Sequence, residues 1–189
     1  MRSHADEATA WLSDKQGEME GALIPLVDEN SYTENPGGGR KVGAMLQGLF
    51  GVEGIEVSVR QSERFADHLV FRSRAQLPNT GAVALVGHLD TVFPPGSFEG
   101  YRRDGDLARG PGVLDMKGGL VVIAFALKAL AATGGLDAVA PVRVVVVGDE
   151  EVGSPEGQGV LRRELAGAAC ALVLEAGRPN DRVITQRKG

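Results

Sequence analysis

The feature that most constrains the fold is the run VRVVVV at residues 142–147, which ends in a glycine and leads directly into three acids. Consecutive β-branched apolar residues without polar alternation are typical of a strand that is buried on both faces of a sheet. Three adjacent carboxylates at the end of such a strand need either solvent or a cation beside them. The run therefore predicts a central strand, and it raises the question of what neutralises Asp149, Glu150 and Glu151.

Further apolar runs and helical periodicities give the rest of the expected architecture. The expected strands are 55–59, 68–72, 82–87, 142–147, 171–174 and 182–186. The expected helices are 5–28, 42–50, 116–132 and 157–166, with loops at 29–39 and 91–114 and a turn at 77–81. The strands at 82–87, 171–174 and 182–186 are expected to be buried, like 142–147. Apolar strands that alternate with helices predict an α/β fold, with three layers (α/β/α) around a largely parallel mixed sheet.

Composition excludes several classes of protein. The chain has 189 residues, enough for one domain, with a net charge of −5 and a pI of about 5.3, which disfavours nucleic acid as a partner. No apolar segment reaches the roughly 20 residues of a membrane span, and no secretory signal is visible, so a cytoplasmic location is expected. Cys170 lies in an apolar run and is expected to be a packed thiol.

Chemically active side chains follow three of the buried strands. His88 and Asp90 follow the strand at 82–87, the acid triplet follows 142–147, and Glu175 follows 171–174. In open α/β sheets, ligands bind beyond the carboxyl ends of the strands, so parallel neighbours would bring these residues to one edge. Asp115 joins them if the loop before its helix returns to the same edge.

Each of these residues has an ordinary explanation when it is taken alone. Asp115 can be a helix N-cap, Asp90 can bond its own loop, Glu175 can be a solvated acid, and a single histidine is more often a polar residue than a ligand. Together they are harder to explain, because several carboxylates at one edge repel one another and no Arg or Lys cluster accompanies them. Metal ions are the natural neutralisers.

The residue types indicate which metal and which roles. One imidazole with carboxylates and no thiolate suits Zn²⁺, while Co²⁺ or Mn²⁺ fits the same ligands, and more than three carboxylates suits a pair of ions about 3.5–4 Å apart. Asp90 is placed to bond the far ring nitrogen of His88. In an extended chain Glu150 and Glu151 point opposite ways, so one can bind metal while the other acts as general base.

Four motifs in this order and spacing resemble a known family: GHLDTVF (87–93), GPGVLDMKGG (110–119), GDEEVGS (148–154) and LEAG (174–177). They are similar to the co-catalytic di-zinc metallopeptidases, a family with a zinc-exopeptidase fold that includes glutamate carboxypeptidase, aminoacylase-1, acetylornithine deacetylase and succinyl-diaminopimelate desuccinylase. The strings DENSYTEN and HLDTVFPPG look most like the glutamate carboxypeptidase branch.

The resemblance implies a role for each matching position. His88 and Glu175 would bind one zinc, Asp115 would bridge the two ions, and Glu151 would bind the second. Glu150 would be the general base that takes a proton from the attacking water.

The resemblance also places Asp90 behind the histidine and implies a cis peptide bond between Asp115 and Met116.

The sequence departs from the family pattern at its C-terminal end. The second zinc of the family takes a further histidine from late in the catalytic domain, and neither His4 nor His68 matches it. The family's lid domain, which carries substrate-binding groups and the dimer contact, also has no counterpart. We interpret residues 1–189 as the N-terminal part of a catalytic domain, incomplete at its C-terminal end, with weak or no catalysis by itself.

The implied function is zinc-dependent hydrolysis of an amide bond, with release of a C-terminal amino acid such as glutamate from a small peptide. Alternatives are deacylation or desuccinylation of an N-acyl amino acid, and a non-catalytic domain that binds a metal or a peptide. No nucleic-acid or membrane partner is expected, and the full-length protein would dimerise through the lid. A serine α/β hydrolase is disfavoured because no G-x-S-x-G elbow is present.

Overall fold

The computed structural model describes residues 3–74, 81–177, 182, 184 and 185. The described elements are, in chain order, α1 (His4–Leu12), α2 (Gln16–Asp28), α3 (Pro36–Leu49), β1 (Ile55–Arg60), β2 (His68–Ser73), β3 (Val83–His88), β4 (Arg102–Asp104), β5 (Leu107–Arg109), α4 (Lys117–Ala132), β6 (Val142–Val147), the 3₁₀ turn η1 (Glu150–Val152), α5 (Gly157–Leu165) and β7 (Cys170–Val173).

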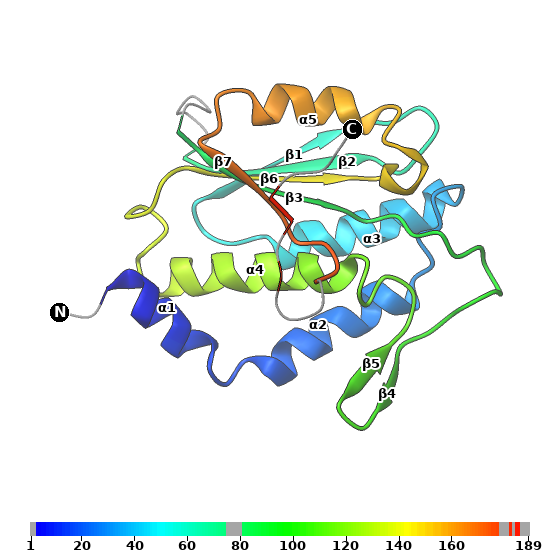
Figure 1. Cartoon of the computed structure of the whole chain (residues 1–189), viewed down its shortest axis with the longest axis horizontal. Coiled ribbons are helices and arrows are strands. Elements are labelled where there is room, and N and C mark those ends of the chain that lie inside the picture. The colour runs from blue at the N-terminus through cyan, green and yellow to red at the C-terminus, as the bar shows by residue number, and fades with distance from the viewer. Residues whose placement is uncertain (1–2, 75–80, 178–181, 183, 186–189) are drawn as a thin grey trace.

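The main sheet has the strand order β1-β2-β6-β3-β7. β1, β2 and β6 pair antiparallel, whereas β6, β3 and β7 are parallel neighbours. Figure 1 shows α5 on one face of this sheet and α3 and α4 on the other, with α1 and α2 packed outside α4. The α/β/α layers and the mixed sheet expected from the sequence are confirmed. Because His88 is level with Val147 in the register, β3 and β6 end at the same edge.

The core lies between the sheet and helices α3 and α4. Every residue of β6 is buried, as its run of valines predicts for a central strand. Phe50 at the end of α3 stacks on Phe71 of β2 with ring centroids 4.5 Å apart, and both side chains are inaccessible to solvent. Burial of this apolar surface fixes the strands relative to one another, and therefore also the loops that leave their carboxyl ends.

The N-terminal helices differ from the expectation. The single helix expected at 5–28 is two helices, because the Ser13 amide and hydroxyl both bond back to the carbonyl of Ala10 and end α1. The loop expected at 29–39 ends early, since α3 already starts at Pro36. Proline suits the first helical position, and the Asn35 side chain accepts the amide of Gly38, so three glycines follow in a capped first turn.

The segment 91–114, expected to be irregular, contains the β4–β5 hairpin. Its strands have three residues each and are exposed, so they show no apolar alternation in the sequence. Gly105 has a φ of +59° in the turn between them, a conformation that glycine adopts without strain.

The prediction that 171–174 is a buried strand is wrong. All four residues of β7 are exposed, and Cys170 is an exposed thiol rather than a packed one. β7 pairs only with β3 in the described sheet, so one of its edges has no partner strand there.

The strand expected at 182–186 and the turn expected at 77–81 fall mainly outside the described residues. Among the helices that the structure describes, none has both the length and the apolar content needed to cross a membrane.

Candidate metal centre

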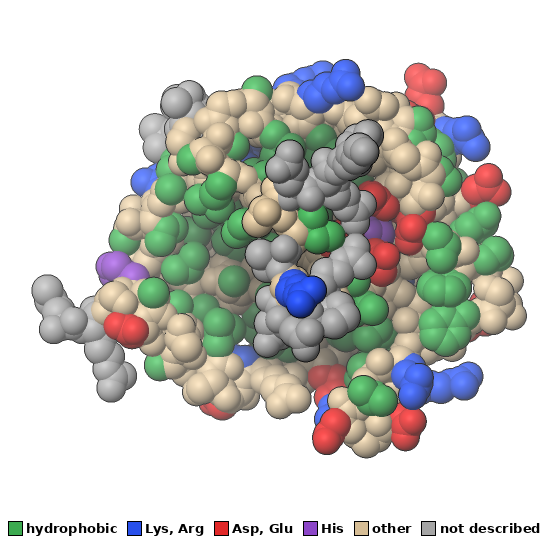
Figure 2. Space-filling view, in the orientation of Figure 1, with side chains coloured by type: hydrophobic (Ala, Val, Ile, Leu, Met, Phe, Trp, Pro, Cys, Tyr) green, Lys and Arg blue, Asp and Glu red, His purple; other side chains and the backbone are tan. Residues whose placement is uncertain are grey.

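The carboxyl ends of the three parallel strands bring most of the predicted site residues together. His88 ends β3, η1 follows β6 after two residues, and Glu175 follows β7 after one more residue. The loop before α4 returns to this edge and adds Asp115. Figure 2 shows acidic side chains gathered around a histidine to the right of the centre of the drawn face. Asp115, Glu150, Glu151 and Glu175 are called the site carboxylates below.

One ring nitrogen of His88 faces the site carboxylates. The side chain is only 1% exposed, and its Nε2 lies 2.9 Å from Oδ1 of Asp115 and 3.2 Å from Oε1 of Glu175. Glu150 is farther away, with Oε2 at 4.0 Å from Nε2. The structure therefore places Asp115 and Glu175 directly beside His88, at the one edge of the sheet where the sequence predicted them to meet.

The other ring nitrogen is held by Asp90. Nδ1 of His88 lies 3.0 Å from the backbone oxygen of Asp90 and 3.4 Å from its carboxylate Oδ1. A proton on Nδ1 can be donated to the backbone oxygen, which leaves Nε2 with its lone pair directed at the carboxylates. The shorter contact of Nδ1 is thus to the backbone oxygen of Asp90, whereas the sequence predicted a bond to its side chain.

The carboxylate of Asp90 binds the turn that carries the two glutamates. Oδ1 accepts the amide of Glu150 at 3.1 Å, and Oδ2 accepts the amide of Glu151 at 3.2 Å. These residues form a 3₁₀ turn rather than an extended chain, so the extended-chain argument for their opposite directions is wrong. Their side chains diverge because successive residues of a three-residue turn point about 120° apart.

The electrostatics of the cluster favour a positive charge at its centre. Burial opposes a charge on His88, but hydrogen bonds to Asp90 and Glu175 outweigh burial and raise its pKa to about 11. Burial, reinforced by the charges of Asp115 and Asp90, raises the pKa of Glu151 to about 7. Burial also raises the pKa values of Asp115 and Glu150, with the charge of Glu175 acting in the same direction.

Apart from His88, no basic side chain neutralises the cluster in the described part of the chain, where no Lys or Arg forms an ion pair with a site carboxylate. Lys117, the nearest base in the sequence, is fully buried and points away. Its Nζ donates to the carbonyl of Leu26 at 2.6 Å and to that of Glu29 at 3.0 Å, at the C-terminal end of α2.

The donors present fit a divalent metal. His88, Asp115 and Glu151 each offer one potential ligand atom, and these three atoms lie within 4.8 Å of one another. Donor atoms bound tetrahedrally to one Zn²⁺ lie about 3.3–3.6 Å apart, close to the distances from Nε2 to Asp115 and Glu175. Of the sequence-predicted residues, His88, Asp115 and Glu151 form this group. Glu175 lies beside it, 3.2 Å from Nε2 of His88, and Asp90 lies behind the histidine.

Two further features lie near the cluster. The peptide bond between Asp115 and Met116 is cis, as the resemblance implies. His68, which matched no metal motif, is buried in β2, where its Nδ1 accepts the amide of Gly148.

Asp149 holds the turn that carries Glu150 and Glu151. It is fully buried, and its Oδ2 accepts the amides of Glu156 at 2.8 Å and Gly157 at 2.9 Å, where α5 begins. It thereby fixes both ends of the loop that contains η1. Thr33, which donates its hydroxyl to Asp90 Oδ2 at 2.8 Å, was not predicted at all, because 57 residues separate the two partners.

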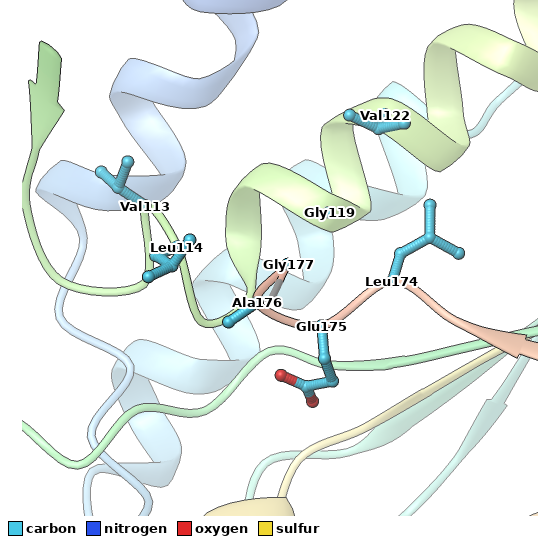
Figure 3. Close-up of a pocket in the computed structure, with 8 residues that line it drawn as sticks. All are labelled: Val113, Leu114, Gly119, Val122, Leu174, Glu175, Ala176 and Gly177. Atoms are coloured by element: carbon cyan, nitrogen blue, oxygen red, sulfur yellow. The ribbon is translucent and has the colours of Figure 1, made fainter. Parts of the chain in front are cut away.

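An open, mainly apolar pocket adjoins the site carboxylates. Its lining comes from the loop before α4, from α4 itself and from the segment after β7, and includes Leu114, Val122 and Leu174. Figure 3 shows Glu175 on the rim of this pocket, with its carboxylate directed away from α4. The apolar surface thus lies next to a potential metal ligand.

Comparison with known protein families identifies the family to which the chain belongs. The profile described as "Peptidase family M20/M25/M40" matches residues 84–186, more than half of the chain. The chain belongs to this peptidase family. The matched segment contains His88, Asp115, Glu151 and Glu175, so the potential ligands lie within the family's own region. The M20 family contains metal-dependent peptidases, and the described site has the donors for a metal.

Solved structures of the M20 family share the fold. Human carnosine dipeptidase 1 superimposes with a TM-score of 0.70 at 18% identity, over 89% of this chain and 40% of that one. A dipeptidase from Saccharomyces cerevisiae gives 0.72 at 14% identity, over 91% and 41%. A metallo-carboxypeptidase from Sulfolobus solfataricus gives 0.66 at 18% identity, over 87% and 39%. The chain thus spans about 40% of the length of these structures. No curated protein sequence matches it.

Proposed function

We propose that the protein carrying this chain hydrolyses amide bonds of small peptides with the help of a divalent metal, as an exopeptidase that releases a C-terminal amino acid such as glutamate. The observation that supports this most strongly is the buried Nε2 of His88, which faces Asp115 and Glu175 without a Lys or Arg beside it among the described residues. Membership of the peptidase family supports peptide hydrolysis. The choice of substrate rests on the resemblance of DENSYTEN and HLDTVFPPG to the glutamate carboxypeptidase branch.

In this proposal His88, Asp115, Glu151 and Glu175 hold the metal, with Zn²⁺ preferred and Co²⁺ or Mn²⁺ compatible. When bound, the metal would polarise the scissile carbonyl and make water a stronger nucleophile near neutral pH. The surrounding protein keeps the first ligand in place, since Asp90 holds Nδ1 of His88 and leaves Nε2 available.

Glu150 is the proposed general base. Its side chain is about half exposed and lies 4.0 Å from Nε2 of His88, so it borders the cluster and remains open to solvent and substrate. Burial and the nearby carboxylates raise its pKa, which strengthens it as a proton acceptor. Glu150 would take the proton of the attacking water at a carboxylate oxygen and deliver it to the leaving nitrogen.

We also propose that residues 1–189 are the N-terminal part of the catalytic domain. The chain spans about 40% of the solved family structures, which supports a larger whole. A second metal would then take its remaining histidine from outside these residues, and the lid and any dimer contact would also lie outside them.

The test compares Glu150→Gln with wild type in the protein that carries this chain, loaded with Zn²⁺. The substrates are a dipeptide ending in glutamate and an N-acetyl amino acid. We expect glutamate release by the wild type and a kcat about 10²–10⁴-fold lower for the variant, at unchanged metal content. Glu53→Gln, on an exposed loop before β1, is the matched control and should keep wild-type turnover.

Three outcomes would refute the assignment. Loss of metal from Glu150→Gln would make Glu150 a ligand instead of a base. Faster turnover of the N-acetyl amino acid than of the dipeptide would replace the exopeptidase with a deacylase. Metal binding without turnover of either substrate would indicate a non-catalytic binding domain.

A further inference from the structure

The segment between α2 and α3 is fastened to the chain that leaves β3. The amide of Thr33 donates to the carbonyl of Thr91 at 3.1 Å, and the amide of Thr91 donates to the carbonyl of Ser31 at 3.0 Å. The hydroxyl of Ser31 also donates to the carbonyl of Leu89 at 2.7 Å. These bonds fix the backbone of Thr33 next to Asp90, independently of the Thr33 side chain.

The hydroxyl of Thr33 has one strong acceptor. The side chain is 2% exposed, and Oγ1 lies 2.8 Å from Oδ2 of Asp90 but 3.4 Å from the carbonyl of Thr91. That carbonyl already accepts the amide of Thr33. Because a hydroxyl has a single proton to donate, the shorter contact to the carboxylate takes it.

Besides its contact with the neighbouring His88 ring, the Asp90 carboxylate receives hydrogen bonds from two distant parts of the chain. The amides of Glu150 and Glu151 bind its two carboxylate oxygens from one side, and the hydroxyl of Thr33 binds Oδ2 from the other. Both amide donors belong to the 3₁₀ turn, and the contact from His88 Nδ1 to Oδ1 is long at 3.4 Å. Without Thr33, Oδ2 would therefore lose its only hydrogen bond, among the described residues, from a part of the chain outside that turn. With Thr33, the carboxylate is tied to the fixed segment after α2.

We propose that Thr33 is a positioning residue: through Asp90 it fixes the turn that carries Glu150 and Glu151, and so holds one ligand and the general base in place. The consequence for metal binding rests on the proposed function, whereas the consequence for the turn does not. Thr33 itself would touch neither metal nor substrate, because its hydroxyl binds Asp90.

The first test follows hydrogen exchange of the Glu150 and Glu151 amides by NMR in the metal-free chain. Thr33→Val keeps the shape and removes the hydroxyl, so both amides should exchange at least about tenfold faster. Thr33→Ser keeps the hydroxyl and should restore wild-type exchange. Thr91→Val is the matched control, because the buried Thr91 hydroxyl has no hydrogen-bond partner among the described residues, and it should change neither amide.

Unchanged exchange in Thr33→Val, or equal acceleration in Thr91→Val, would overturn the inference. If Thr33→Val does not fold, Thr33→Ala takes its place: faster exchange of both amides than in Thr33→Ser supports the role, and exchange equal to Thr33→Ser refutes it.

The second test measures Co²⁺ affinity by titration calorimetry. Thr33→Val should bind Co²⁺ about tenfold more weakly than wild type, with Thr33→Ser and Thr91→Val unchanged. Equal affinity in Thr33→Val would overturn the effect on the metal site. If wild type binds no Co²⁺, the proposed function fails, while the exchange experiment still decides whether Thr33 holds the turn.

Discussion

The strongest quantitative prediction concerns the pH dependence of metal affinity. In the metal-free chain the pKa of His88 is raised to about 11, against an ordinary value of 6.5, and that of Glu151 to about 7, against 4.5. A ligand whose pKa lies above the working pH carries a proton that the metal must displace. Affinity should therefore rise with pH and fall as the solution becomes acidic.

The size of the effect follows from these two groups. Between pH 8 and pH 6, His88 stays protonated, and its proton competition lowers the metal affinity about 100-fold. Glu151 changes from mainly deprotonated to mainly protonated, which lowers the affinity by about a further tenfold. The dissociation constant should thus increase about 1000-fold. Groups with ordinary pKa values would give only about a fourfold change over the same range, nearly all of it from the histidine.

The assay is a calorimetric titration of the chain with Co²⁺ at pH 6, 7 and 8, in pairs of buffers that differ in ionisation enthalpy. The buffer dependence of the heat gives the number of protons released, expected to be about one at pH 8 and about two at pH 6. Release of less than half a proton at pH 8, with an affinity change below about tenfold, would refute the protonated cluster described above.

Two predictions concern stability, measured by urea unfolding. Gly119→Ala should lower the unfolding free energy by about 1–3 kcal/mol, because an added Cβ would lie 2.1 Å from the carbonyl oxygen of Leu174; Gly21→Ala, in a helix with open space around it, should raise it by about 0.5–1 kcal/mol. Equal effects of the two substitutions would contradict a clash between the added Cβ at position 119 and the carbonyl of Leu174. Lys117→Met should cost about 2–3 kcal/mol, since it leaves the carbonyls of Leu26 and Glu29 without their donor, whereas Lys128→Met on the same helix should cost less than about 1 kcal/mol. A neutral Lys117→Met would show that its buried charge costs as much as its hydrogen bonds contribute.

The sequence predicts the centre of the site well, for a physical reason. Apolar strands such as 142–147 are long enough and uniform enough to be recognised, and parallel neighbours end at one edge of the sheet. His88 and Glu175 follow such strands within two residues, so their convergence depends on strand order alone. Because β6, β3 and β7 are neighbours in the sheet, the residues after these strands meet at one edge.

Other features escape sequence reasoning because they depend on contacts distant along the chain. The apolar residues of β7 resemble those of a buried strand. Its exposure depends instead on which strands lie beside it, and in the described sheet only β3 does. The β4–β5 hairpin has short polar strands without a pattern. The bond from Thr33 to Asp90 depends on how the segment after α2 lies against the chain after β3, which no local motif encodes.

Binding of a divalent metal by His88 and the site carboxylates can be measured by titrating this chain with Co²⁺ at pH 8. The visible absorption of the bound ion and the calorimetric stoichiometry are measured for wild type, His88→Ala and the exposed-site control His4→Ala. The account predicts at least one Co²⁺ per chain for wild type and His4→Ala, and an affinity at least about 100-fold weaker for His88→Ala. No binding by wild type, or equal binding by His88→Ala, would contradict it.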